Sequence, residues 1–379
     1  MSKKNIIIIT LAVLLGIGLS FSAGLLFGLG DPYSQGTGPA IIDEAWSRIL
    51  SEYVDRDGID TDTLSHGAIR GMVQALDDPY SSFLEADEYT LYSSDIEGTF
   101  EGIGAYITFK EGKLSVIAPI VDSPAEKAGV KAGDTILEID GESVENMSFA
   151  EAVLKIRGPQ GTSLKLLISR EGESEPLVIE IIREKVEVAS VRLERKGDFV
   201  HITITEFTQR TGQEMEEILQ GIDEGTTKGI VLDVRGNPGG IVHAVVEVAS
   251  HFIRDDVIIY IRDNQGNVSP ENRVDVTPVT DLPIVLLVDN SSASGSEVLA
   301  GALQDYDRAI IAGTTTFGKG SVGQFIVLND GSAILLTTSR WLTPDHHLIE
   351  GQGIIPDVNL EVTGEEAVQW AINYLTEHY

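Results

Sequence analysis

Cysteine is missing from all 379 residues, and basic residues are scarce: 27 lysines and arginines stand against 59 aspartates and glutamates. The missing cysteine excludes a disulfide framework and any thiol chemistry. The resulting formal net charge of −32 at pH 7 argues against binding to nucleic acid, which requires a basic surface. It argues equally against charge-driven binding to anionic lipid, so we interpret the acidity as a solubility feature.

A metal-binding pattern is missing as well. The seven histidines form no cluster with aspartate or glutamate at the spacing of metal ligands. None of them stands in a recognisable triad pattern either. We therefore expect no metal and no cofactor, and a base other than histidine if the chain is an enzyme.

Charge itself is missing from a long stretch near the N-terminus, between Lys4 and Asp31. This run exceeds the roughly 20 residues that cross a bilayer as a helix. We therefore expect residues 1–30 to be an uncleaved single-pass anchor in a bacterial-type cell membrane. Lys3 and Lys4 would keep the N-terminus cytoplasmic and place the rest of the chain outside. The alternative is a signal peptide cut near "SFSAG", which would leave the chain secreted or periplasmic.

Three further parts follow this segment. Residues 31–96 contain a Gly/Pro/Ser linker and then two amphipathic helical patterns, which predict a small helical module. Residues 97–187 carry short strand patterns around a short helix. Residues 188–379 alternate strands with helices, which predicts an α/β layer with ligands at the carboxyl ends of its strands. The runs "AIIAG", "SVGQFIVL" and "SAILLTTS" are expected to complete that sheet.

Residues 97–187 resemble a PDZ domain. The matching segments are "GIGAYI" (102–107), "SPAEKAGVKAGDTILEIDGESV" (123–144) and "SFAEAVLKIRGPQGT" (148–162), in the order and spacing of that fold. The resemblance implies a small β-barrel-like sandwich with helices. Such a domain adds a peptide as a strand to its sheet edge and holds the free carboxylate of the peptide in backbone N–H groups. The implied carboxylate-binding loop is Gly102, Ile103, Gly104 and Ala105.

Serines crowd the segment "VDNSSASGSEVLAGALQD" (288–305), between an apolar strand pattern and a helical pattern. Serine is a good N-cap and a poor helix-interior residue, so one serine would be enough to cap this helix. A strand-to-helix turn also suits a nucleophilic serine, because helix N–H groups there face developing negative charge. The conspicuous base downstream is Lys319, since a desolvated lysine loses its proton and can then accept one from serine.

With these motifs in order, the chain resembles the carboxy-terminal processing proteases, which are tail-specific serine proteases of the Ser–Lys type. The resemblance implies a ClpP/crotonase-like α/β core with an inserted PDZ domain and N-terminal helices. Its further motifs are "DVRGNPGG" (233–240), "SASGSE" (292–297), "TFGKGSV" (316–322), "LTPDHHLIEGQGIIPDV" (342–358) and "GAIRGMVQALDDPYSSFL" (67–84).

The resemblance also implies individual roles. Ser294 is the nucleophile and Lys319 the general base. The oxyanion hole uses the N–H of Gly295 and a second N–H from "GNPGG", either Gly239 or Gly240. The family usually has alanine where Gly295 stands here, but only the backbone N–H is needed. Ser292 and Ser296 are then expected to bond turn or helix-end backbone groups.

The position of a glutamine departs from the family pattern. The family commonly has glutamine four residues after the lysine, where it orients the base. Here that position is Gly323, and Gln324 follows it. On a strand, one residue turns a side chain to the other face. A β-bulge at Gly323 would return Gln324 to the site; without it, the third catalytic residue is missing.

The family likeness implies partners and regulation as well. Arg157 stands at a family position that couples the peptide-bound PDZ domain to the protease core, so a bound tail would switch the site on. The implied substrates are proteins with a free, apolar C-terminus. A homodimer through the N-terminal helices is implied, and an adaptor protein is left open. Two alternatives remain: a catalytically impaired PDZ-containing binding protein, and a crotonase-like acyl-CoA enzyme, which an exported chain disfavours.

Overall fold

The chain is described here by a computed structural model that places residues 38–96, 99–110, 113–120, 122–145, 147 and 149–379. The expected anchor, residues 1–30, lies outside these residues. Within the described part, no helix combines the length and the apolar character that crossing a bilayer requires. The contacts divide the chain into two units, Met1–Ala68 and Ile69–Tyr379, with the boundary inside the second N-terminal helix.

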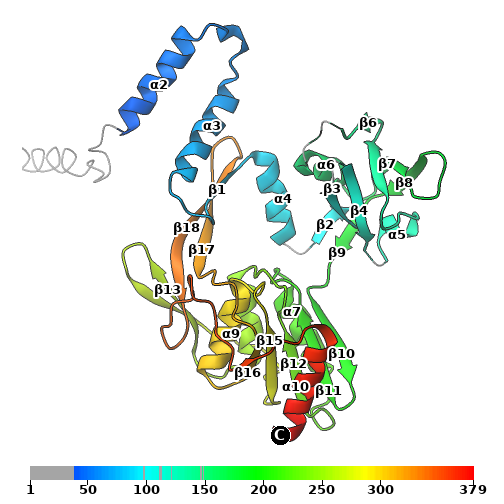
Figure 1. Cartoon of the computed structure of the whole chain (residues 1–379), viewed down its shortest axis with the longest axis vertical. Coiled ribbons are helices and arrows are strands. Elements are labelled where there is room, and N and C mark those ends of the chain that lie inside the picture. The colour runs from blue at the N-terminus through cyan, green and yellow to red at the C-terminus, as the bar shows by residue number, and fades with distance from the viewer. Residues whose placement is uncertain (1–37, 97–98, 111–112, 121, 146, 148) are drawn as a thin grey trace, which may run out of the picture. The chain divides into compact units, whose positions relative to one another are not determined.

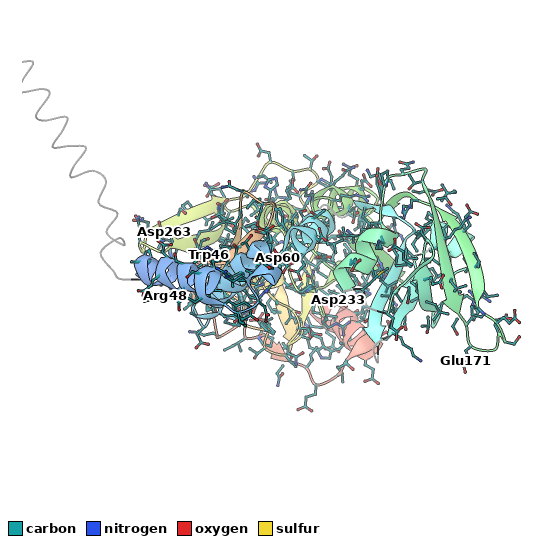
Figure 2. The ribbon with its side chains drawn as sticks, turned by 90° about the horizontal axis from the view of Figure 1, so that it is seen from above. Trp46, Arg48, Asp60, Glu171, Asp233 and Asp263 are labelled. Atoms are coloured by element: carbon teal, nitrogen blue, oxygen red, sulfur yellow. The ribbon has the colours of Figure 1, made fainter. Side chains whose placement is uncertain are left out.

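The two predicted N-terminal helices are present as α2 (Gly38–Glu52) and α3 (Thr61–Gln74), joined by the short 3₁₀ helix η1 (Arg56–Gly58). Asp60 starts α3, because its carboxylate accepts hydrogen bonds from the Asp62 N–H and the Thr63 hydroxyl. Helix α2, which carries Trp46 and Arg48 (Figure 2), has no buried residue. Its apolar side chains therefore form a face without a partner inside this helix pair.

The predicted PDZ strands form one antiparallel sheet in the order β3-β4-β5-β7-β8. Strand β3 is an edge of that sheet, and the buried residues of the domain form a separate apolar cluster. Figure 2 labels Glu171 on the turn after β7. The elements are β3 (Ala105–Lys110), β4 (Lys113–Pro119), α5 (Pro124–Lys127), β5 (Thr135–Ile139), β6 (Glu142–Ser143), α6 (Phe149–Ile156), β7 (Ser163–Ser169) and β8 (Leu177–Ile182), flanked by the paired strands β2 (Thr99–Gly102) and β9 (Glu184–Glu187).

The C-terminal part contains a mainly parallel sheet in the order β10-β11-β12-β15-β16-β19. Only the edge strand β10 runs antiparallel to its neighbour. Apolar runs such as "IVLLV" predict these strands, because both faces of the sheet are buried. The strands are β10 (Val191–Lys196), β11 (Phe199–Ile204), β12 (Gly229–Asp233), β15 (Ile284–Val288), β16 (Ile310–Gly313) and β19 (Val358–Asn359).

Strand β15 shows how this sheet is covered on both faces. Leu286 and Val288 join the apolar cluster formed with α7, α8 and α9, whereas Val285 and Leu287 join the cluster formed with α10. Figure 1 shows α10 (red) lying against these strands. The alternation follows from the period of two along a strand. The helices are α7 (Thr211–Gln220), α8 (Val242–Ser250), α9 (Gly295–Asp305) and α10 (Gly364–His378).

A second sheet corrects the expectation that three late strands complete the first one. Only β16 joins the parallel sheet, while β17 and β18 pair with each other and with two other strands. The turn at Asp330 and Gly331 is too short for a parallel crossover, so the two strands form an antiparallel hairpin. The members are β1 (Ser82–Leu84), β13 (Val257–Asp263), β14 (Val268–Asn272), β17 (Ser321–Val327) and β18 (Ala333–Leu342), and α4 (Ala86–Ile96) follows β1.

Candidate active site

Ser294 lies on the sharp turn between strand β15 and helix α9. Its φ of 52° and ψ of −111° are unusual for a non-glycine residue, and it occupies the N-cap position of α9. The Ser294 N–H donates to Glu297 Oε2 at 2.8 Å, which holds the turn in this conformation. A strained strand-to-helix turn of this kind presents a serine hydroxyl at the end of a sheet. Ser294 is only half-buried, as a nucleophile must be.

The neighbouring serines bond backbone groups, which confirms the expectation for them. The Ser292 hydroxyl donates to the Val234 carbonyl at 2.8 Å and accepts from the Asp289 N–H at 3.0 Å. The Ser296 hydroxyl donates to the Asn237 carbonyl at 3.0 Å. Both serines are fully buried. They therefore fasten the β15–α9 turn to the turn after β12.

Gly239 packs its backbone against the nucleophile turn. Its φ is +104°, and a Cβ there would lie 2.7 Å from Ser294 Cβ and 2.8 Å from Gly295 N. The Gly239 N–H already donates to Asn237 Oδ1 at 2.8 Å. Within the described residues, the N–H groups of Gly240 and Gly295 donate to no backbone carbonyl and no side chain. Of the two predicted glycines, Gly240 therefore has the available donor to accompany Gly295.

Asn237 is a site residue whose role the motif "GNPGG" does not reveal by itself. It is completely buried. Its side-chain amide donates to the Ile204 carbonyl at 2.9 Å, and its own carbonyl accepts from the Ala293 N–H at 3.0 Å. Asn237 thus joins the end of β11, the glycine turn and the nucleophile turn.

Asp233 begins the "DVRGNPGG" segment at the carboxyl end of β12 (Figure 2). Burial acts to raise the pKa of this carboxyl, but hydrogen bonds from Arg235 and His201 hold the pKa below its usual value. Arg235 Nη2 lies 2.6 Å from Asp233 Oδ2. The paired carboxylate is therefore a structural anchor for the start of the turn. Among the described residues, no three histidine or acidic side chains gather as a metal site would require.

Lys319 lies on the loop between β16 and β17 and is half-buried. Its Nζ is 5.2 Å from the centre of the Tyr80 ring. Within the described residues, the Lys319 ammonium has neither a carboxylate within ion-pair distance nor a hydrogen-bond acceptor. The Lys319 backbone N–H donates to Glu297 Oε2 at 2.8 Å. The loop is thus attached to helix α9 at the turn that carries Ser294.

Glu297 connects the two predicted catalytic segments, and it too was assigned no role from the sequence. It is completely buried. Its Oε2 accepts from the N–H groups of Ser294 and Lys319, each at 2.8 Å. Its Oε1 accepts from the Gly318 N–H and the Thr316 hydroxyl, each at 2.6 Å. The signal was available, because Ser294 and Glu297 form the S-x-x-E pattern of a capping box.

Gln324 is exposed on β17, and its side chain makes no hydrogen bond to Lys319 or to any other described residue. The pairing of β17 with β18 is irregular at the expected place, since Val322 pairs with Ser339 and Gly323 with Thr337. The extra residue is therefore Thr338 on β18, whereas a bulge on β17 was considered from the sequence. The structure does not bring Gln324 together with the lysine.

The predicted carboxylate-binding loop connects β2 to β3, the free edge of the PDZ sheet. Gly104 has a φ of +73°, and a Cβ there would lie 2.5 Å from Ser123 Cβ, so only glycine fits. The Ser123 hydroxyl donates to the Gly104 carbonyl at 2.8 Å, which fixes the loop. Arg157 lies at the end of α6, with its guanidinium 4.7 Å from the Phe100 ring centre.

Comparisons with known proteins agree with this layout. The chain matches Peptidase family S41 over residues 198–360, PDZ domain over residues 116–170 and Activating protease CtpB N-terminal domain over residues 39–88. The carboxy-terminal processing protease CtpB of Bacillus subtilis (strain 168) is 37% identical over 325 residues, covering 84% of this chain and 67% of that protein. The carboxy-terminal-processing protease of Bartonella bacilliformis is also 37% identical, covering 84% of this chain and 74% of that protein.

A solved structure shows the same relationship. The photosystem II D1 C-terminal processing protease aligns at 30% identity with a TM-score of 0.51, covering 84% of this chain and 91% of that chain. The expected family, the α/β core and the PDZ domain are therefore confirmed. The chain belongs to peptidase family S41 and is a carboxy-terminal processing serine protease that carries a PDZ domain.

Proposed function

We propose that this chain is a membrane-tethered extracytoplasmic endopeptidase that binds the free C-terminal tail of a protein and cuts the protein by Ser–Lys catalysis. The observation that supports the catalytic part is the Glu297 carboxylate, which fastens both the Ser294 turn and the Lys319 loop. A strained turn and a lysine loop held by one buried group keep nucleophile and base in a fixed relation.

In the proposed reaction, the Ser294 Oγ attacks the carbonyl carbon of the scissile peptide while Lys319 Nζ takes its proton. The oxyanion that forms is stabilised by the N–H groups of Gly295 and Gly240. Lys319 then passes the proton to the leaving amine, which departs with the C-terminal fragment. Water hydrolyses the remaining acyl-enzyme, again with Lys319 as the base.

Tail recognition is proposed for the PDZ loop, Gly102 to Ala105. The free edge of β3 offers backbone groups to an added strand, and the fixed glycine loop before it offers N–H groups to a carboxylate. Arg157 is proposed to pass the bound state of this domain to the protease core. An Arg157→Ala enzyme would then lose the rate difference between tailed and tailless substrates.

The full chain in detergent, as wild type and as Ser294→Ala, provides the test. Each is mixed with an unfolded protein that ends in an apolar free carboxylate, and with the same protein amidated at its end. We expect cleavage by wild type alone, faster with the free carboxylate. Equal cleavage of both substrates would reject tail recognition, and cleavage by Ser294→Ala would reject the nucleophile.

A second candidate function is a binding protein without turnover, which the exposed position of Gln324 favours. The buried Glu297 linkage opposes this alternative, because a pure binding protein has no need of a fixed lysine loop. The same experiment separates the two, since binding of the tail without cleavage by wild type would establish the binding protein.

Membrane attachment through residues 1–30 and dimerisation through α2 belong to the same proposal. The uncharged N-terminal run supports the anchor, and the exposed side chains of Ile42 and Ile49 support an α2 interface. Extraction of membranes with alkaline carbonate should leave the chain in the pellet. Sedimentation of Ile49→Glu as a monomer beside a dimeric wild type would support the interface.

A further inference from the structure

Lys319 needs a group that orients its side chain, and the described residues offer no polar group for that role. A flexible lysine side chain loses rotamer entropy when it is held in one position. Gln324, the predicted orienting residue, points into solvent. The contact that the Lys319 ammonium makes is with the face of Tyr80, at 5.2 Å from the ring centre. This distance is within the roughly 6 Å of a cation–π interaction.

Hydrogen bonds hold the turn that carries Tyr80, although Tyr80 lies far from Lys319 in the sequence. The Tyr80 N–H donates to Asp78 Oδ1 at 3.2 Å, and the Ser81 hydroxyl donates to Asp78 Oδ2 at 2.6 Å. Ser81 in turn accepts from the Thr337 N–H at 3.0 Å. The following strand, β1, pairs with β18. The turn that carries Tyr80 is therefore part of the second sheet.

The lysine loop is attached to the same sheet. Directly after Lys319, the Gly320 carbonyl accepts from the Trp341 N–H at 2.8 Å, and Ser321 pairs with Arg340 of β18. Tyr80 thus precedes β1 and Lys319 precedes β17, and both of these strands pair with β18. These hydrogen bonds fix the two main-chain segments relative to each other, so the fold keeps the ring within reach of the lysine.

We propose that Tyr80 is the positioning residue for Lys319, taking with its ring face the part that a hydrogen-bonding side chain would otherwise play. This inference rests on the proposed Ser–Lys mechanism. The ring restricts the lysine side chain and shields one side of it from water. Its face also attracts the positive charge that appears on Nζ when Lys319 takes the serine proton.

This attraction has a defined effect on rate. Where the resting lysine is neutral, charge over the ring exists only in the transition state, so the ring lowers the barrier. Where the resting lysine is already charged, the ring stabilises both states and the effect cancels. Removing the ring should therefore lower the rate on the high-pH plateau and leave the rate on the low-pH limb unchanged. The apparent pKa of the rate profile then moves downward by the logarithm of the factor that the plateau loses.

Other charged groups around the pair must stay constant in such a comparison. The groups that act on Tyr80 are the carboxylates of Glu350, Glu297 and Asp78 and the guanidinium of Arg340. Burial, followed by the three carboxylates, raises the pKa of the Tyr80 hydroxyl above its ordinary value. Substitutions at Tyr80 leave all four groups in place.

The experiment measures the rate at which a fluorophosphonate phosphonylates Ser294 of the full chain in detergent, with loss of fluoride, as a function of pH. For Tyr80→Leu we expect a plateau about fivefold lower and an apparent pKa moved to lower pH, with the low-pH limb unchanged and with recovery of both values in Tyr80→Phe. Tyr80→Met is a second ring-free variant if the leucine variant unfolds. Tyr89→Leu, which removes a half-buried tyrosine that contacts Phe325, is the matched control and should keep the wild-type profile.

Two results would overturn the inference. A rate that falls by the same factor at every pH, with the apparent pKa unchanged, would give Tyr80 a merely structural role, and an unchanged profile would give it none. Lys319→Ala and Ser294→Ala are measured in parallel. If Lys319→Ala reacts at the wild-type rate, the Ser–Lys mechanism itself fails. If it is slow while the Tyr80 variants match wild type, only the role of Tyr80 fails.

Discussion

At the scale of single residues, the Glu297 carboxylate joins the two halves of the proposed catalytic machinery. Each of its oxygens accepts two hydrogen bonds, with Oε1 serving Thr316 and Gly318 and Oε2 serving Ser294 and Lys319. In Glu297→Gln, one oxygen becomes an NH₂ group, so two donors lose their acceptor whichever way the amide turns. We expect a loss of about 2 kcal/mol of unfolding free energy and of about 100-fold in kcat.

Urea unfolding and kcat of the purified variant check this expectation. The matched control is Glu361→Gln, because Glu361 is exposed and its side chain makes no hydrogen bond to a described residue. A Glu297→Gln enzyme with wild-type kcat would show that the two segments do not depend on this carboxylate for their positions.

The position of the Ser294 turn also depends on Gly239, through close packing and not through a hydrogen bond. In Gly239→Ala the new methyl group would lie 2.7 Å from Ser294 Cβ, on a residue whose φ is +104°. The nucleophile turn must then move, and we expect kcat to fall at least about 100-fold. Gly236→Ala is the control, since Gly236 has a φ of +69° in the same turn but open space around it. Equal rates for the two variants would argue against a packed turn.

At the scale of elements, helix α8 ends in a buried histidine that makes stability depend on pH. His251 is the C-cap residue, and its Nδ1 lies 2.6 Å from the Pro278 carbonyl oxygen. Burial lowers the pKa of His251 below its ordinary value of 6.5. Between the folded and the ordinary pKa the unfolded chain binds the additional proton, so stability is complete above about pH 6.5 and is lost as pH falls through the folded pKa.

The free energy of unfolding, measured at pH 7.5 and pH 5.5, should therefore fall more steeply for wild type than for His251→Gln. Glutamine removes the titrating group and retains a donor for the Pro278 carbonyl. Other groups also titrate over this range, but they do so in both proteins and cancel in the difference. Parallel pH dependences of the two proteins would contradict a buried neutral histidine.

The elements also show where sequence patterns suffice and where they do not. Strands β12 and β15 were predictable, because a strand buried on both faces is a continuous apolar run. The hairpin of β17 and β18 was assigned to the wrong sheet, because a strand pattern does not identify its pairing partner. Helix α10 was missed, although Ala367, Val368, Ala371 and Leu375 recur at helical spacing and form its buried face.

At the scale of the whole molecule, local sequence patterns predicted the catalytic motifs of the site but not the contacts between distant segments. Ser294 and Lys319 stand in short motifs and could be proposed from their neighbours in the chain. The contact of Lys319 with Tyr80 depends on the pairing of β1 with β18, across more than half of the sequence. No local pattern contains that pairing, so the partner of the lysine becomes visible only in the folded chain.

The PDZ domain and the protease core each have an apolar core of their own. Leu166 lies in the apolar cluster of the PDZ domain, and Leu286 lies in the apolar cluster that the parallel sheet forms with α7, α8 and α9. Both leucines are completely buried, and no residue belongs to both clusters. Cutting either leucine to alanine should cost about 2–5 kcal/mol in its own domain. Calorimetry should then show two transitions, of which Leu166→Ala lowers only one and Leu286→Ala only the other. A single transition that both variants lower equally would mean that the PDZ domain and the protease core unfold as one unit.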